Sequence, residues 1–153
     1  MRGAAGTLLA ALLIGSAMTA AGAQRPPKPP PTIEMLQMEF VGRTGSDIVY
    51  FAGNSHGLDA AAQRTLMAQA TWLLANPAVR ARIEGHADER TPRDYALAVA
   101  ERRATAVRDF LLLQGVPAAQ LTMISWGKER PVVAGMSEGA LALNRRVKTV
   151  LMR

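Results

Sequence analysis

The clearest pattern in the chain is an alternation of apolar and charged residues that leads into a helical repeat. Residues 79–84 read Val-Arg-Ala-Arg-Ile-Glu, and this period of two predicts a half-buried strand. A polar loop containing Pro92 follows, and Asp94 is the expected N-cap of the next helix, because a short carboxylate can accept the free amides of a first turn. Apolar residues then recur at intervals of three and four, which predicts one buried helical stripe. The stripe consists of Tyr95, Val99, Ala106, Val107 and Phe110.

One arginine lies inside this stripe. At about 100° per residue from Tyr95, Arg103 falls at about 80°, in the middle of the stripe, whereas Arg102 falls at about 340°, on its edge. An unpaired buried charge costs several kcal/mol, so Arg103 needs an acceptor. The structural interpretation is an ion pair with Asp88 or Glu101. The functional interpretation is that Arg103 and Asp88 face one crevice and hold a small ligand that carries both a carboxylate and an ammonium group.

The remaining apolar patterns complete a two-layer α/β sandwich. Residues 33–41 are apolar enough to pack as a strand or as a helix, and the pattern does not decide between them. The order strand, helix, strand, helix, strand, strand (βαβαββ) predicts an α+β fold with right-handed first crossovers and with the helices on one face of a mixed sheet. Helices are expected at 58–75, 94–114 and 137–143, and strands at 47–51, 79–84, 121–126 and 146–152.

The N-terminal third predicts a leader and a tether ahead of the folded domain. Residues 1–23 combine Arg2, an apolar run and small residues ending in Ala21-Gly22-Ala23, which is typical of a cleaved secretory signal. An uncleaved anchor is the alternative, but glycine, serine and threonine interrupt the run, and a span needs about 20 apolar residues. Residues 24–45 predict a proline-rich, extended tether with a lead-in, and residues 46–153 the domain. No transmembrane span is expected after cleavage.

Four motifs follow one another along the folded part of the chain: GHADER at 85–90, AERRATAV at 100–107, SWGKERPVV at 125–133 and NRRV at 144–147. In wording and order they resemble the OmpA C-terminal-like family, and most of all its lipid-anchored, peptidoglycan-associated members. The resemblance covers roughly Asp47 to Met152 and implies the same fold. It also implies non-covalent binding of peptidoglycan, through the diaminopimelate of the stem peptide, in the periplasm and in association with the outer membrane or the cell wall.

The resemblance also implies which residues bind the ligand. The family's acidic residue corresponds to Asp88 and its arginine to Arg103, which are 103 − 88 = 15 positions apart as the family pattern requires. Helical phase selects Arg103 independently. Asn144 and Arg145 lie near the pocket in relatives. The residues expected to support the site are His86, Tyr95 and Arg102.

The chain departs from the family pattern at four places. It has no cysteine and therefore no lipidation site of the family's type. Ala52-Gly53-Asn54 replaces an acidic segment, Thr91 replaces a loop glycine, and Ala96 replaces an asparagine. These changes make weakened binding an alternative. In that case the domain is an envelope module that binds another protein, and Tol-type envelope proteins are the candidate partners because they dock on an overlapping surface in relatives.

Composition excludes several other functions. Without Arg2 the net charge is (18 − 1) − 12 = +5. Few aromatic residues accompany the cations, so we do not expect binding to nucleic acid. The carboxylates of cell-wall peptides would suit a positive charge of this size. His86, Asp88 and Glu89 could bind a metal or act as an acid–base pair. The chain has only two histidines, however, and no other ligand spacing or catalytic motif. We therefore expect no enzyme, no cofactor and no metal.

Overall fold

The computed structural model describes residues 25–153, so the predicted signal peptide lies outside the described residues. Residues 25–32 are exposed and have no regular secondary structure. The folded unit spans Pro31–Arg153. It therefore includes residues 33–41, which form the first part of a helix, α1, at Ile33–Thr44.

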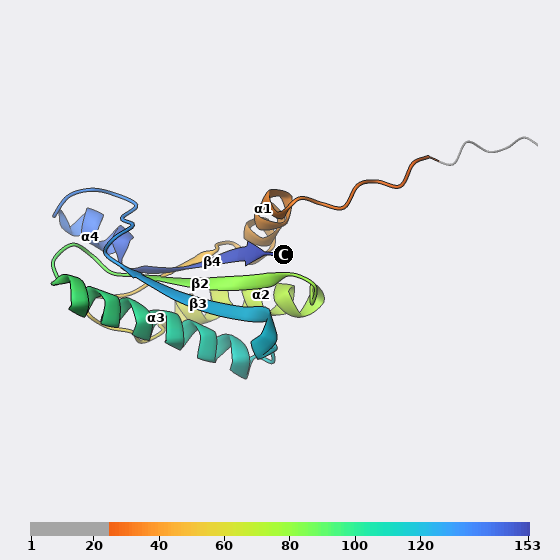
Figure 1. The fold of residues 1–153 in the computed structure, drawn as a ribbon. Helices are drawn as coiled ribbons and strands as arrows, with labels where there is room; N and C mark the ends of the chain where they lie inside the picture. The colour runs from red at the N-terminus through yellow and green to blue at the C-terminus, as the bar shows by residue number, and fades with distance from the viewer. Residues whose placement is uncertain (1–24) are drawn as a thin grey trace, which may run out of the picture. The chain divides into compact units, whose positions relative to one another are not determined.

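The remaining elements form the predicted two-layer fold with a mixed sheet (Figure 1). The strand order is β1-β4-β2-β3; β2 and β3 run parallel, whereas β4 runs antiparallel to both β1 and β2. This arrangement confirms the fold class predicted from the sequence. The bounds are β1 Ile48–Tyr50, α2 Ala60–Ala75, β2 Arg80–His86, α3 Arg93–Leu113, a short 3-10 turn at Ala118–Gln120, β3 Leu121–Gly127, α4 Glu138–Asn144 and β4 Arg146–Met152.

Helices α2 and α3 cover one face of the sheet, and small residues bring α3 very close to β2. A Cβ atom built on Gly85 would lie 2.0 Å from the backbone oxygen of Ala100, and 3.1 Å from the Cβ atom of Ala104. Ala96, Ala100 and Ala104 are all fully buried. The alanine side of α3 thus packs directly on the strand, and this packing sets the position of Arg103 one residue before Ala104.

Two details of α3 differ from the sequence prediction. The residue at the N-cap position is Pro92, without a side-chain cap, and Asp94 lies inside the first turn, so the predicted Asp94 cap is wrong. Tyr95 is 46% exposed and is not part of the buried stripe. The reason is the close approach at Gly85, because the buried face is centred on small alanines rather than on the larger side chains that define the apolar pattern.

Helix α1 packs on α2 and beside β4. Its Leu36 and Phe40 join the main core, where Phe40 meets Trp72 edge to face at 5.1 Å between ring centroids. The side chain of Gln37 bonds to the part of β4 that extends past Ile48, the first residue of the three-residue strand β1: it donates to the carbonyl of Thr149 at 3.1 Å and accepts from the amide of Leu151 at 2.8 Å. Gln37 therefore takes the place of a neighbouring strand at this edge.

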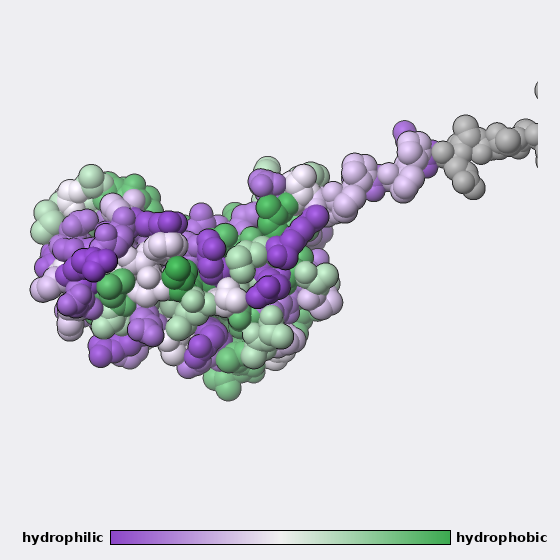
Figure 2. Space-filling model, viewed as in Figure 1, coloured by the Kyte–Doolittle hydropathy of each residue, from purple (hydrophilic) through white to green (hydrophobic). Residues whose placement is uncertain are grey.

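The second face of the sheet, the open face, is polar but not uniformly exposed. Glu84 and His86 on β2 point away from the helices, yet they are only 7% and 3% exposed. The sequence predicted a half-buried strand at residues 79–84, and the structure buries Glu84 as well, although it lies on the face without helices. Figure 2 shows hydrophilic and hydrophobic residues mixed over the surface, with an apolar area at the α4 end. Val132 and Met136, in the segment between β3 and α4, are exposed.

Candidate functional site

Asp88 lies in the loop that connects β2 to α3 and is almost completely buried. It is 3% exposed, and its carboxylate accepts three hydrogen bonds at 3.3 Å or less. The backbone amide of Arg90 donates to Oδ1 at 3.0 Å, which closes a local turn, and the Arg90 guanidinium donates to Oδ2 at 2.8 Å. Arg145 donates to the same Oδ2 at 3.3 Å. Asp88 is thus held as an anion by two arginines.

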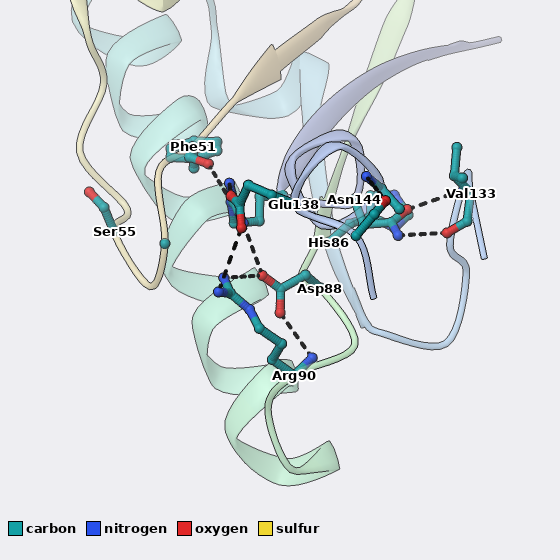
Figure 3. Close-up of polar contacts among 12 residues, drawn as sticks. Phe51, Ser55, His86, Asp88, Arg90, Val133, Glu138 and Asn144 are labelled. Carbon is teal, nitrogen blue, oxygen red and sulfur yellow. Dashed lines mark hydrogen bonds and ion pairs between the residues drawn. The ribbon is translucent and has the colours of Figure 1, made fainter. Parts of the chain in front are cut away.

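Arg145 connects this carboxylate to two other parts of the chain. Its Nε donates to the carbonyl of Phe51, just beyond β1, at 3.0 Å, and its Nη2 donates to Glu138 in α4 at 2.9 Å. The charged network therefore consists of Arg90, Asp88, Arg145 and Glu138, at the end of the sheet where β1 ends and β4 begins (Figure 3). Arg145 is buried at the centre of the network, whereas the side chains of Arg90 and Glu138 are 43% and 73% exposed.

Arg103 is buried beside this network, but it makes no ion pair with Asp88 or Glu101. Its guanidinium donates to three backbone carbonyls: Gly53 at 2.6 Å, Ser55 at 2.8 Å and His86 at 3.1 Å. It also lies over the ring of Phe51, at 5.3 Å from the centroid. The predicted depth of Arg103 is confirmed, since it is 1% exposed. The predicted structural ion pair is wrong, because the loop after β1 folds over the arginine and supplies its acceptors.

The protonation states follow from burial and from these contacts. Burial raises the pKa of Asp88, but hydrogen bonds from Arg90 and Arg145 outweigh it and lower that pKa below its usual value. Burial lowers the pKa of Arg103 to about 10, against the opposing effect of the Asp88 charge. At neutral pH both groups are therefore charged, and they carry opposite signs.

The structure brings only some of the sequence-predicted residues to this network. Arg145 contacts Asp88 directly, and Arg103 lies close enough for the two charges to interact. The His86 side chain is near Glu84, with Nε2 at 4.0 Å from Oε2, and it is the backbone carbonyl of His86 that binds Arg103. His86 therefore takes part in the site through its main chain.

The other three predicted residues lie elsewhere. Asn144 is fully buried and holds the loop after β3: its Oδ1 accepts from the amide of Val132 at 2.8 Å, and its Nδ2 donates to the carbonyl of Val133 at 2.8 Å. Tyr95 and Arg102 are exposed on α3. Arg102 lines a separate groove of about 550 Å³ with His56 and Glu101 among its neighbours.

Sequence reasoning missed two members of the network and the acceptors of Arg103. Arg90 could have been found, because it follows Asp88 by two residues, the spacing at which an aspartate side chain accepts the backbone amide of a turn. Glu138 and the carbonyls of Gly53 and Ser55 come from distant parts of the chain. No local pattern marks a backbone carbonyl as the partner of an arginine 50 positions away.

Between residues 25 and 153, no cluster of three histidine or carboxylate side chains is arranged to hold a metal ion. No helix in the same range has the length and apolar character needed to cross a membrane.

Comparison with known sequences connects this chain to one family. A sequence model of the OmpA family matches residues 50–145. The chain is 46% identical over 115 residues to the peptidoglycan-associated lipoprotein of Agrobacterium fabrum, covering 75% of this chain and 64% of that protein. It is 48% identical over 99 residues to the protein of the same name from Pseudomonas aeruginosa, covering 65% and 58%. The chain thus spans less than two thirds of the length of these relatives.

Solved structures give the same result for the fold. The crystal structure of the peptidoglycan-associated lipoprotein from Burkholderia pseudomallei matches with a TM-score of 0.69 and 38% identity, covering 71% of this chain and 92% of that one. The C-terminal domain of MotB from Helicobacter pylori matches with a TM-score of 0.66 at 21% identity, covering 70% and 84%. At that identity the MotB match supports the fold alone.

Proposed function

This chain belongs to the OmpA family, and from that premise we propose that it binds peptidoglycan non-covalently in the cell envelope, through Asp88 and Arg103. The relatives at 44–48% identity carry the name peptidoglycan-associated lipoprotein. The ligand group proposed is the free end of diaminopimelate in the stem peptide, which carries an ammonium and a carboxylate on one carbon. The proposed activity is binding, with no bond made or broken.

The observation that carries the proposal is a pair of buried, opposite charges that do not neutralise each other directly. Asp88 and Arg103 are 3% and 1% exposed, yet each is satisfied by groups other than its counterpart. A purely structural ion pair would form a direct contact, because direct contact recovers most of the cost of burying both charges. Two separate sites of opposite sign instead match a ligand that carries both charges.

Asp88 is proposed to bind the ammonium group in the position that Arg90 occupies. The Arg90 side chain is 43% exposed, and its guanidinium lies 2.8 Å from Oδ2 of Asp88, so a cation already occupies the place proposed for the ligand. Arg90 can move into solvent because its side chain is partly exposed, and the ammonium group of the ligand then replaces its positive charge beside Asp88. Arg145, buried and bonded to Phe51, stays in place and keeps Asp88 ionised.

Arg103 is proposed to bind the carboxylate once the loop after β1 moves. The guanidinium donates to the carbonyls of Gly53 and Ser55, both in this loop, and to the carbonyl of His86 on β2. A carboxylate can replace the two loop carbonyls while the third contact keeps the side chain oriented. Each charge-assisted contact contributes about 1.5–3 kcal/mol, minus the cost of displacing the loop, so affinity for one stem peptide is modest. A polymeric wall offers many such sites and strengthens attachment.

The proposal includes location and processing. Secretion through cleavage of residues 1–23 places residues 24–153 in the periplasm, where binding to the wall would hold the protein close to the outer membrane. Residues 24–32 then act as a tether to the folded unit. The alternative, an envelope module that binds a Tol-type protein instead of the wall, is not favoured by any of the comparisons.

Co-sedimentation of the purified protein with insoluble peptidoglycan sacculi tests this proposal. The bound protein should be released by the tripeptide L-Ala-γ-D-Glu-meso-diaminopimelate. The same tripeptide with L-Lys in the third position should not release it, because the lysine side chain ends in an ammonium group without a carboxylate. Failure to sediment, or equal release by the two peptides, would count against the proposal without any mutant.

Variants then assign the residues. Asp88→Asn and Arg103→Gln should each weaken sedimentation about tenfold or more, since each loses a charge-assisted contact. Arg93→Ala is the matched control, because it also removes an arginine from an ion pair, with Glu129 at 2.7 Å, but away from the charged network. Circular dichroism checks that each variant is folded. Equal binding by all three variants would exclude Asp88 and Arg103 as the contacts.

A further inference from the structure

A row of four polar or aromatic side chains crosses the open face of the sheet, and the proposed peptidoglycan site does not use them. Tyr50 on β1 pairs with Arg146 on β4. In the antiparallel pairing of β2 with β4, Gly85 lies opposite Val147. The same register places the next residue of β2, His86, opposite Arg146. On β3, Trp126 lies at the irregularity where β2 and β3 change register. We call Tyr50, Arg146, His86 and Trp126 the open-face row.

Three members of the open-face row have buried polar atoms without a partner in the described residues. Arg146 is 6% exposed; its Nη2 donates to the carbonyl of Arg130 at 3.1 Å, but its Nε and Nη1 make no hydrogen bond. The indole Nε1 of Trp126 and the Nδ1 of His86 also lack partners. Buried donors are almost always satisfied in folded proteins, so unpaired donors on neighbouring side chains indicate a missing acceptor.

The charges on this face indicate the sign of that acceptor. Arg130 stacks on the ring of Trp126 at 3.4 Å and makes no side-chain hydrogen bond or ion pair with residues 25–153. The nearby carboxylate of Glu84 is already bonded to Arg82, at 2.8 Å from its Nε. Burial first, and then the charges of Arg146, Arg130 and Lys148, lower the pKa of His86, so the imidazole is neutral and adds no charge of its own. The local excess is therefore positive.

We propose that the open-face row is a binding site for an oxyanion, a phosphate or carboxylate group that accepts from Arg146 and Trp126 and is neutralised by Arg146 and Arg130. Arg130 controls access, because it lies on the outside and only stacking holds its side chain in place. The site is independent of the charged network. Arg146 and Trp126 make no hydrogen bond or ion pair with Asp88, whose partners are Arg90 and Arg145. The side chain of His86 belongs to the open-face row, whereas its backbone carbonyl accepts from Arg103.

Nuclear magnetic resonance of the ¹⁵N-labelled full chain tests the proposal with an internal control. The protein has two tryptophans, Trp126 in the row and Trp72 packed against Phe40 in the core. Inorganic phosphate and acetate are titrated separately at pH 7 and constant ionic strength. A saturable shift of the Trp126 indole signal, with Trp72 unmoved, is expected for one or both anions, and the arm that responds assigns the site to phosphate or to carboxylate groups. No shift in either arm, or equal shifts of both indoles, would overturn the proposal.

Two substitutions separate a specific site from general attraction to a basic protein. Arg130→Ala should weaken the binding of whichever anion shifts the Trp126 signal by about fivefold, as expected for the loss of one exposed cation. Arg108→Ala removes the same charge from α3, which packs on the other face, and should leave the titration unchanged. Arg146→Gln should abolish the shift. If Arg146→Gln does not fold, the first pair still decides, because equal weakening by Arg130→Ala and Arg108→Ala would contradict a defined site.

Discussion

The two faces of the sheet bury two arginines in opposite ways. On the face covered by α3, Arg103 reaches three backbone carbonyls and lies over an aromatic ring. On the open face, Arg146 is nearly as buried but has one hydrogen bond and two unpartnered nitrogens. Burial of a guanidinium group therefore does not by itself show whether its hydrogen bonds are satisfied. Arg103 is integrated into the fold, and a ligand must displace part of the fold to reach it. Arg146, in contrast, has two nitrogens for which the fold provides no acceptor.

The difference has its origin in backbone placement. The loop after β1 crosses over Arg103 and brings its carbonyls there, whereas the loop after β3 brings one carbonyl, that of Arg130, to Arg146. The covered face is also closely packed, because Gly85 lets α3 approach β2. We therefore expect substitutions on the covered face to affect stability strongly and substitutions on the open face to affect it little.

The largest expected effect is that of Gly85→Ala. The added Cβ atom would lie 2.0 Å from a backbone oxygen of α3, so the helix itself would have to move. We expect a loss of about 4 kcal/mol or more in the free energy of unfolding, measured by urea denaturation. Gly42→Ala in α1 is the control, since nothing lies within 4 Å, and it should be neutral or stabilising by about 0.5–1 kcal/mol. Similar values for the two variants would contradict the close packing described for α3.

The next effect is a contrast between Arg103→Met and Arg146→Met. Arg103→Met leaves the buried carbonyl of His86 and the part-buried carbonyls of Gly53 and Ser55 without their donor, so the free energy of unfolding should fall by about 2–4 kcal/mol. Arg146→Met removes two unsatisfied donors and a single hydrogen bond, and the change should stay within about 1 kcal/mol. The same urea titration measures both, and an equal cost would remove the distinction between the two faces.

A third effect concerns pH and the open face. The pKa of His86 is lowered to about 3 by burial and by the charges of Arg146, Arg130 and Lys148, although Glu84 lies on the same strand. Below the usual value near 6.5, the unfolded chain binds a proton at His86 that the folded chain does not bind. The free energy of unfolding therefore decreases as the pH falls from about 6.5 towards 3, by up to about 1.4 kcal/mol per pH unit.

Urea titrations at pH 7.5 and pH 5.0 measure this dependence. Wild type should lose about 2 kcal/mol between them, and His86→Gln should lose much less. His56→Gln serves as the control and should behave as wild type. Parallel losses in wild type and His86→Gln would show that another group causes the dependence.

The smallest effect on stability is expected for Arg90→Ala. The side chain is 43% exposed, and Asp88 keeps Arg145 and the backbone amide of residue 90, so the free energy of unfolding should change by less than about 1 kcal/mol. Binding to sacculi should increase by about two- to fivefold, because no side chain then competes with the ligand for Asp88. Weaker binding in the sedimentation assay would indicate that Arg90 contacts the wall instead of competing with it.

The sequence was sufficient for the fold and for the depth of Arg103. The period-two alternation identified β2, and helical phase placed Arg103 on the buried side of α3, as the structure confirms. The same phase argument was wrong for Tyr95. It assumed that the largest apolar side chains mark the buried face, whereas α3 packs on β2 through small alanines that lie opposite Gly85.

The contacts of the candidate site were less predictable. Charge complementarity suggested an ion pair between Arg103 and Asp88, but it does not register backbone carbonyls, and these are what bind Arg103. The partners of Asn144 were not predictable for a similar reason: they are main-chain groups of Val132 and Val133, in a loop without a regular sequence pattern. Side-chain chemistry can be read from a sequence, but the path of a loop over the fold cannot.

Gln37 has a consequence for how the protein should be handled. A strand whose outer backbone groups are free can recruit a strand from another molecule. Without Gln37, the part of β4 that extends past Ile48, the first residue of β1, would be such a strand. A fragment that starts at residue 46, where the strand pattern begins, would lack α1 and expose this edge. Such a fragment should self-associate and lose solubility at high concentration, whereas one that starts at residue 31 should stay monodisperse.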